Sequence, residues 1–160
     1  MPDRPPPDDP GELTRFIEER YHARHRTDLP EAAALAERVE QVHRDTPDVP
    51  QGLAMLLRQM IGELEVHMKM EELILFPAIR RGGMPGIENP IAMMRTDHDD
   101  HAIEVGRIRA LTKGFIPPSD ACGTWRLLYA RLADFVSDLE EHIRLENEVL
   151  FPHFEVAGAR

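Results

Sequence analysis

The chain has 160 residues, with 29 acidic against 19 basic side chains and a formal net charge of −10. Its length suits one domain with a real core. Its acidity argues against the basic face that nucleic acids and anionic membranes require, so we expect neither as a partner. The single cysteine, Cys122, excludes an internal disulfide and a metal cage built from cysteines.

The first eleven residues contain five prolines and three aspartates. Such a segment has too little apolar area to order itself, so we predict a flexible tail over residues 1–11. The tail has no apolar run of the kind found in secretory signals, and no stretch approaches the roughly 20 apolar residues that cross a bilayer. We therefore expect a cytoplasmic protein whose folded domain covers residues 12–157.

Four helical stretches follow, at about residues 13–43, 51–79, 90–113 and 121–154, with proline and glycine clustered at the joints. No sustained alternation of period two indicates a strand, so the predicted class is all-α. Short joints between long helices predict an up-down-up-down four-helix bundle. Pro30 either starts a second segment or kinks the first helix, and Pro77 and Pro152 lie in the last turns of their helices.

The second and fourth stretches each carry an apolar stripe that a histidine and a glutamate interrupt. Polar groups on a core face are costly unless they are paired or bound to metal. The stripe residues recur at steps of three and four, as expected for one face of an α-helix: Leu53, Leu56, Met60, Leu64, His67, Glu71 and Ile74 in the second stretch, and Leu128, Leu132, Phe135, Leu139, His142, Glu146 and Val149 in the fourth.

The two interruptions belong to an internal repeat. HMKMEELILFP at 67–77 and HIRLENEVLFP at 142–152 both read HxxxE, three residues, then LFP, with an offset of 75. The histidine pairs His22/His25 and His98/His101 repeat with an offset of 76. We therefore predict two helix pairs related by a pseudo-two-fold axis.

Counted from the helix ends, one histidine of each stretch falls at a similar depth near the same end of the bundle. Residues i and i+4 share a helix face, so His67 with Glu71 and His142 with Glu146 each offer one nitrogen and one carboxylate inward. His22 and His98 complete a set of four imidazoles and two carboxylates, although the spacing alone does not separate them from His25 and His101. Glu63 and Asp138 lie one turn before His67 and His142, where they are placed to accept the second ring N–H or to relay protons.

This set has the composition of a two-metal site. If both carboxylates bridge two metals, each metal has two oxygen ligands, and two histidines of its own bring the number of ligands to four. An oxo or hydroxo bridge is the fifth ligand, so an octahedral metal keeps one open position. Mixed nitrogen and oxygen ligands favour iron or manganese, and this much imidazole favours iron. We therefore predict two iron ions with oxo or hydroxo and carboxylate bridges.

The remaining polar residues have simpler interpretations. We interpret His43 as a surface or capping residue at the far end of the bundle, and Cys122 as a small buried residue near a helix start rather than a nucleophile. Methionines are core filler. His153 is expected to be exposed, and Glu72, Glu140, Glu141 and Glu148 are expected to be solvated.

The sequence resembles a known protein family. The two HxxxE–LFP segments are similar to the HHE motifs of hemerythrin-like proteins. YHARHRTDLP, VEQVH, TDHDDH and ACGTW resemble the iron-sulfur cluster repair di-iron proteins within that family, over roughly residues 20–155. The resemblance implies a non-haem di-iron centre, and it assigns as ligands the first histidine of each pair, His22 and His98, together with His67, Glu71, His142 and Glu146. It also places Glu63 and Asp97 on the approach to the centre.

The resemblance implies a protein that binds nitric oxide, or releases iron, to protect or rebuild the clusters of iron-sulfur proteins under nitrosative or oxidative stress. Members of the repair family carry a small N-terminal domain with adjacent cysteines, whereas this sequence has the short Pro-rich segment there. An oxygen-binding or oxygen-sensing hemerythrin is an alternative, but oxygen carriers have a fifth histidine where this chain has Ala102. A nitric oxide or peroxide reductase is another, although no flavin or haem motif is present. The last alternative is a bundle whose histidines are only hydrogen-bonded, and such a protein would bind no metal.

Overall fold

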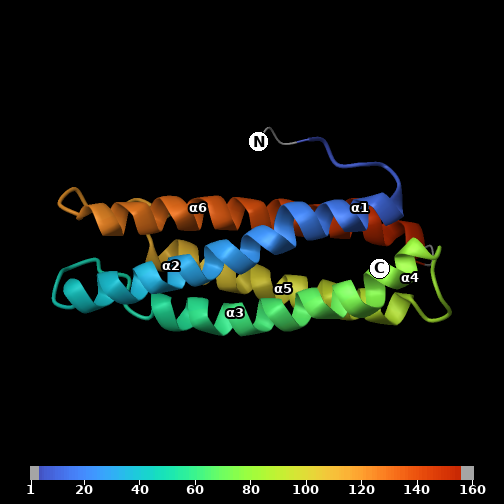
Figure 1. The fold of residues 1–160 in the computed structure, drawn as a ribbon. Helices are drawn as coiled ribbons and strands as arrows, with labels where there is room; N and C mark the ends of the chain where they lie inside the picture. Colours follow the sequence, from blue (N-terminus) through green and yellow to red (C-terminus); the bar gives the residue numbers. More distant parts are fainter. Residues whose placement is uncertain (1–3, 156–160) are drawn as a thin grey trace.

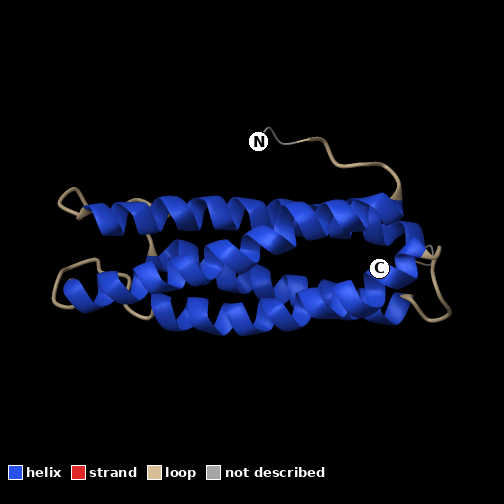
Figure 2. Cartoon of the chain, viewed as in Figure 1, coloured by secondary structure: helices blue, strands red, loops and turns tan. Residues whose placement is uncertain are grey.

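The computed structural model describes residues 4–155, and within that range it consists of helices and loops without a strand (Figures 1 and 2). Successive helical legs run in opposite directions, which confirms the predicted up-down-up-down bundle. The first leg contains α1 (Pro10–Ile17), η1 (Glu18–His22) and α2 (Ala23–Val42); the second contains α3 (Leu53–Met70), η2 (Glu71–Leu75) and α4 (Phe76–Arg80); the third is α5 (Glu88–Leu111); the fourth contains α6 (Gly123–Arg144), η3 (Leu145–Leu150) and η4 (Phe151–Phe154).

The first leg begins earlier than its apolar pattern predicted. The Asp9 side chain accepts a hydrogen bond from the Glu12 backbone N–H at 2.9 Å, and Pro10 supplies a preset φ at the first helical position. Residues 10 and 11, expected in the tail, are therefore helical. Residues 1–3 of that tail and residue 157, the expected end of the domain, lie outside the described range. Further along, α2 continues through Pro30, which does not start a separate helix.

Three short π-helical segments widen the legs at a similar height. In each of them the residue after the segment donates its backbone N–H to the carbonyl five residues earlier: Ala23 to Glu18, Phe76 to Glu71, and Phe151 to Glu146. Such bulges add one residue to a turn and are frequent at functional sites.

The extra residue shifts the helical frame, which corrects the last position of each predicted stripe. Ile74 is 47% exposed and Val149 is only half-buried, whereas their neighbours Leu75 and Leu150 are fully buried. The stripes predicted from steps of three and four, without an extra residue, contain Ile74 and Val149 instead.

Two apolar clusters fill the bundle. The larger one packs Leu57, Leu64, Phe135 and Leu139 between α2, α3 and α6, and the smaller one packs residues such as Phe76 from α1, α4, η3 and the start of α5. The histidines and glutamates of the repeat come between these clusters along the chain, so the polar layer is closed by apolar side chains on both sides.

At the far end of the bundle, the structure places His43 as expected and corrects Cys122. His43 is the C-cap residue of α2, where its ring packs on Trp125 with centroids 5.1 Å apart. Cys122 is exposed rather than buried, at the N-cap of α6, and its Sγ lies 3.2 Å from His43 Nε2. Among the residues from 4 to 155, no helix is long and apolar enough to cross a membrane.

Candidate metal centre

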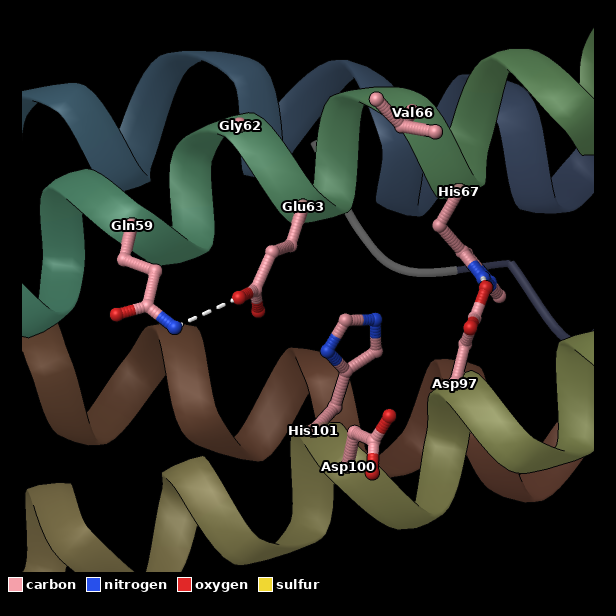
Figure 3. Close-up of a pocket in the computed structure, with 8 residues that line it drawn as sticks. All are labelled: Gln59, Gly62, Glu63, Val66, His67, Asp97, Asp100 and His101. Carbon is pink, nitrogen blue, oxygen red and sulfur yellow. Dashed lines mark hydrogen bonds and ion pairs between the residues drawn. The ribbon is translucent and has the colours of Figure 1, made fainter.

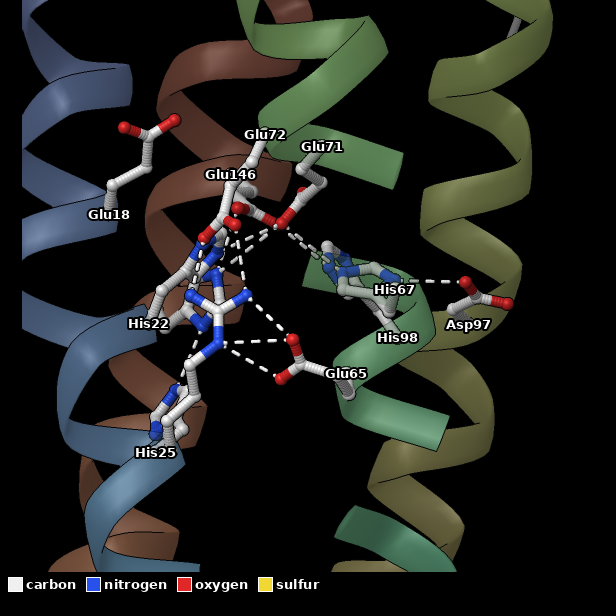
Figure 4. A network of polar contacts seen from close by, with 12 residues as sticks. Glu18, His22, His25, Glu65, His67, Glu71, Glu72, Asp97, His98 and Glu146 are labelled. Atoms are coloured by element: carbon white, nitrogen blue, oxygen red, sulfur yellow. Dashed lines mark hydrogen bonds and ion pairs between the residues drawn. The ribbon is translucent and has the colours of Figure 1, made fainter. Parts of the chain in front are cut away.

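The structure brings the six predicted ligands together in the interior of the bundle, and Figure 4 labels all of them except His142. They come from all four legs, and their side chains are almost completely removed from solvent. Relative exposures are 2% or less for His22, His67, Glu71, His98, His142 and Glu146.

Their donor atoms form two groups that share both glutamates. His22 and His142 form one group with Glu71 and Glu146, and His67 and His98 form the other with the same two carboxylates. Within each group, one donor atom from every residue lies within 4.8 Å of the others. This is the arrangement that two carboxylates bridging a pair of cations require.

All four histidines direct Nε2 toward the glutamates. Nε2 of His22 lies 3.1 Å from Glu71 Oε1, and Nε2 of His67 lies 3.5 Å from the same oxygen. Nε2 of His98 lies 2.9 Å from Glu146 Oε1, and Nε2 of His142 lies 2.8 Å from Glu146 Oε2.

The opposite ring nitrogen, Nδ1, has a different partner in each case. Outer partners of this kind orient metal-ligating imidazoles and fix their tautomer. The four pairs are His22 with Glu72 at 2.7 Å, His67 with Asp97 at 2.9 Å, His98 with Asn147 at 2.7 Å, and His142 with His25 Nε2 at 3.0 Å.

Two of these partners are related by the repeat, because Glu72 and Asn147 are 75 residues apart. Glu72 was expected to be solvated, but it is half-buried between His22 and Arg26. The histidine and arginine hydrogen bonds lower the pKa of Glu72 to about 2. The sequence signal was present in the frame of the repeat, since both residues directly follow the glutamate of HxxxE.

The phenylalanine of each LFP segment also has a role that sequence reasoning missed. Phe76 stacks on His22, with ring centroids 5.8 Å apart and planes at 12°, and Phe151 stacks on His98 at 5.9 Å and 5°. Both phenylalanines are fully buried. Each repeat therefore supplies two donors to the centre and an apolar wall for a histidine of the preceding leg.

Electrostatics within the site favour a bound cation. Burial alone would lower the pKa of His22, but hydrogen bonds to Glu71 and Glu72 raise it to about 9. For His67, burial is outweighed by Glu71 and Asp97, and its pKa also rises to about 9. The carboxylates thus retain protons on the imidazoles when no other cation is near, and a metal ion would take the place of those protons.

Several buried nitrogen and oxygen atoms of the site have no hydrogen-bond partner in the described part of the molecule, and a metal ion would satisfy them. Four buried atoms have no hydrogen-bond partner within the described chain: Nε2 of His67, Nε2 of His98, Oε2 of Glu71 and Oε1 of Glu146. His98 Nε2 and Glu146 Oε1 are close, yet they lack the alignment of a hydrogen bond. Unsatisfied buried polar atoms cost about 1–3 kcal/mol each, and four of them around one point match the needs of metal ligation.

The three predicted outer acids are placed differently from one another. Asp97 contacts His67 directly, as given above. Glu63 instead accepts a hydrogen bond from Gln59 at 2.8 Å, and Asp138 forms ion pairs with Arg20 at 3.1 Å and Arg24 at 3.6 Å. Neither Glu63 nor Asp138 therefore takes the position at the second ring nitrogen that one helical turn would allow.

The second histidine of each pair lies beside the centre rather than in it. His25 is buried and supports His142 from outside. His101 is buried with its ring edge-on to His67 at 5.4 Å, and its Nδ1 lies 3.2 Å from Glu104. Ala102 is exposed and lines a pocket of about 460 Å³ with His98, so position 102 offers no donor.

A buried layer of four histidines and two shared carboxylates, held by four antiparallel helical legs, defines the class of carboxylate-bridged metal-binding bundles. The chain belongs to the hemerythrin family: the family described as the hemerythrin HHE cation binding domain matches residues 16–154. This confirms the resemblance drawn from the HxxxE–LFP motifs, and the family and donor set together indicate iron binding.

The chain is also similar to proteins named iron-sulfur cluster repair protein YtfE. It is 46% identical to the one from Pectobacterium carotovorum subsp. carotovorum (strain PC1) over 142 residues, which are 89% of this chain and 64% of that protein. It is 47% identical to the one from Yersinia pseudotuberculosis serotype O:1b over 140 residues, or 88% of this chain and 63% of the relative. The chain therefore spans just under two thirds of the length of these relatives.

Proposed function

We propose that this chain holds two iron ions and acts in the protection or repair of iron-sulfur clusters, by binding nitric oxide or by giving up iron. The observation that carries the proposal is the pair of donor groups that share Glu71 and Glu146. Each group supplies two imidazoles and two carboxylates, which leaves an octahedral metal with positions for outside ligands. Iron would supply the affinity for a small diatomic molecule and the redox chemistry.

The protein's own residues would hold and tune this centre. His22 and His142 would hold one ion, His67 and His98 the other, and their Nδ1 partners would keep each ring aimed inward. Stacked aromatic rings exclude water from two of the histidines. A pocket of about 510 Å³ lined by His67 and Asp97 gives a small ligand access to one side (Figure 3).

The role in repair is supported by the similarity to proteins named for iron-sulfur cluster repair, and iron-sulfur proteins are accordingly the proposed partners. The oxygen-carrier alternative is less well supported, because residue 102 is an alanine and supplies no fifth imidazole. Nitric oxide is therefore the proposed diatomic ligand, with oxygen as the competing one.

The first experiment measures iron per chain and then adds nitric oxide to the anaerobically reduced protein while its absorption and paramagnetic resonance spectra are recorded. We expect two irons and a stable nitrosyl spectrum. A reversible oxygen adduct without a nitrosyl would favour the oxygen-binding alternative, and absence of metal after iron-replete expression would refute the centre.

A second experiment tests the role in cells. A strain lacking the gene is expected to be sensitive to nitric oxide and to regain tolerance with the wild-type gene. His67→Ala should fail to restore tolerance, whereas His153→Ala, which changes an exposed histidine outside the centre, should restore it. Equal restoration by both variants would refute the proposal.

A further inference from the structure

A second cluster of metal-ligand residues lies between α3 and α5, next to the centre but sharing no residue with it. It consists of Glu63 on α3 and of His101 and Glu104, which are one turn apart on α5. One donor atom from each lies within 4.8 Å of the other two. His101 is 3% exposed and Glu104 is 5% exposed, whereas Glu63 lies at the surface of the bundle.

No arginine or lysine neutralises this cluster among the described residues; burial and a hydrogen bond with Glu63 instead raise the pKa of Glu104 to about 8, so the two carboxylates share a proton that a metal ion would displace. The basic contact of Glu104 is His101 Nδ1, at 3.2 Å. Arg107 acts on Glu104 only through longer-range attraction. Two carboxylates this close need a proton or a cation between them.

The internal repeat supplies a comparison within the same molecule. By the offsets of 75 and 76, the counterparts of Glu63, His101 and Glu104 are Asp138, His25 and Asp28. There the charge is met by arginine, because Arg20 and Arg24 both pair with Asp138.

The positions equivalent to those two arginines carry Thr96 and Asp100 on α5. The half of the bundle that contains Glu63 therefore has no arginine at either equivalent position, and at one of them it has an additional aspartate. Arginine thus meets the charge of Asp138 in one half, whereas no arginine pairs with Glu63 or Glu104 among the described residues of the other.

The cluster is also accessible from solvent. His101 faces Glu104 with Nδ1, and its other ring nitrogen, Nε2, is buried without a hydrogen-bond partner in the part of the chain that the structure describes. Glu63 and His101 both line the pocket of about 510 Å³, and the Glu63 carboxylate turns toward the His101 ring across the gap between the helices (Figure 3). Asp100 lines the same pocket without belonging to the cluster.

We propose that Glu63, His101 and Glu104 form a third metal site, which takes one divalent transition-metal ion. One imidazole and two carboxylates are a ligand set that Zn²⁺, Fe²⁺ and Mn²⁺ all accept. The ion would join α3 to α5 and would supply the positive charge that arginine supplies in the other half. This inference does not depend on the reaction of the six-residue centre.

Zinc is the probe, because its X-ray absorption edge is separate from that of iron and because it binds this ligand set. Crystals of the iron-loaded protein are soaked in zinc chloride, and anomalous scattering is recorded at the zinc and iron edges. We expect a zinc peak between the three side chains, with the iron content unchanged. Zinc found only at the six-residue centre, or no zinc peak at the cluster, would overturn the proposal.

Zinc affinity in solution is then measured by calorimetry on iron-loaded variants. Glu104→Gln removes one of three ligands at nearly constant shape, and we expect zinc affinity to fall by about tenfold or more, since even loss of an outer partner has that effect. Asp100→Asn is the control, because it removes the same charge from the pocket that Glu63 and His101 line, and it should leave affinity near that of the wild type.

Glu63→Gln provides a second, surface-exposed test should Glu104→Gln fold poorly, and it should weaken zinc binding to a similar degree. Wild-type affinity in both glutamine variants would overturn the proposal. Equal weakening in Asp100→Asn would do the same, because it would indicate diffuse attraction to the acidic pocket rather than a defined site.

Discussion

Replacement of Asp97 by alanine tests whether the outer partners hold the ligand histidines in place. His67 is buried to 98%, its Nδ1 lies 2.9 Å from Asp97 Oδ2, and no other hydrogen bond to that nitrogen is recorded among the described residues. Loss of such a partner typically costs 10–100-fold in metal affinity. Asp97 is 41% exposed and borders the open pocket, so water can replace its carboxylate in part. We therefore expect the lower end of the range, about tenfold or 1.4 kcal/mol.

The assay is competition for iron with a chelator of known affinity, followed by the absorbance of the chelate. Asp99→Ala is the control, because Asp99 is exposed on the same helix and lies outside the pocket. The reasoning is refuted if both variants lose iron equally, or if Asp97→Ala holds iron as tightly as the wild type.

Three further predictions concern stability. Leu75→Ala should lower the free energy of unfolding by about 2–5 kcal/mol, whereas Ile74→Ala should lower it by about 0.5 kcal/mol or less. The reason is that, of these two residues, the π-helical turn buries only Leu75. Equal losses of stability in denaturant titrations would contradict the shift of the helical frame. In the metal-free protein, His22 and Arg26 hold the pKa of Glu72 at about 2, below its ordinary value of 4.5. The contribution of the Glu72 carboxylate is therefore complete above pH 4.5 and lost as the pH falls toward 2, so the stability difference from Glu72→Gln should shrink over that interval. It should shrink again as the pH rises through about 9, where His22 loses the proton that Glu72 helps to hold. Removal of metal by a chelator should lower the unfolding temperature, since a ligand at 1,000 times its dissociation constant contributes about 4.1 kcal/mol; an unchanged temperature in calorimetry would mean that no metal had been bound to the folded state.

The fold and the position of the centre were predictable because both depend on local periodicity. Apolar residues at steps of three and four define helical faces, and short joints make neighbouring helices antiparallel. The 75-residue repeat then places His67, Glu71, His142 and Glu146 on inward faces at one height. None of these steps requires knowledge of how two helices pack.

The choice within each histidine pair was not available from spacing. His22 and His25 are three residues apart and share a helix face, so both are compatible with the same layer. Only the packed bundle shows that Nε2 of His22 approaches Glu71 while that of His25 approaches His142. The resemblance to a family, rather than the physics of the sequence, had selected His22.

By itself, the sequence determined the class of fold, the repeat and the layer at which the polar donors meet, because these follow from contacts within single helices. Tertiary structure alone decided the partners of the ring nitrogens, the stacking of the LFP phenylalanines and the difference between Leu75 and Ile74. Those features depend on π-helical turns and on side chains from legs far apart in sequence, whose energies balance only when all four legs are packed together.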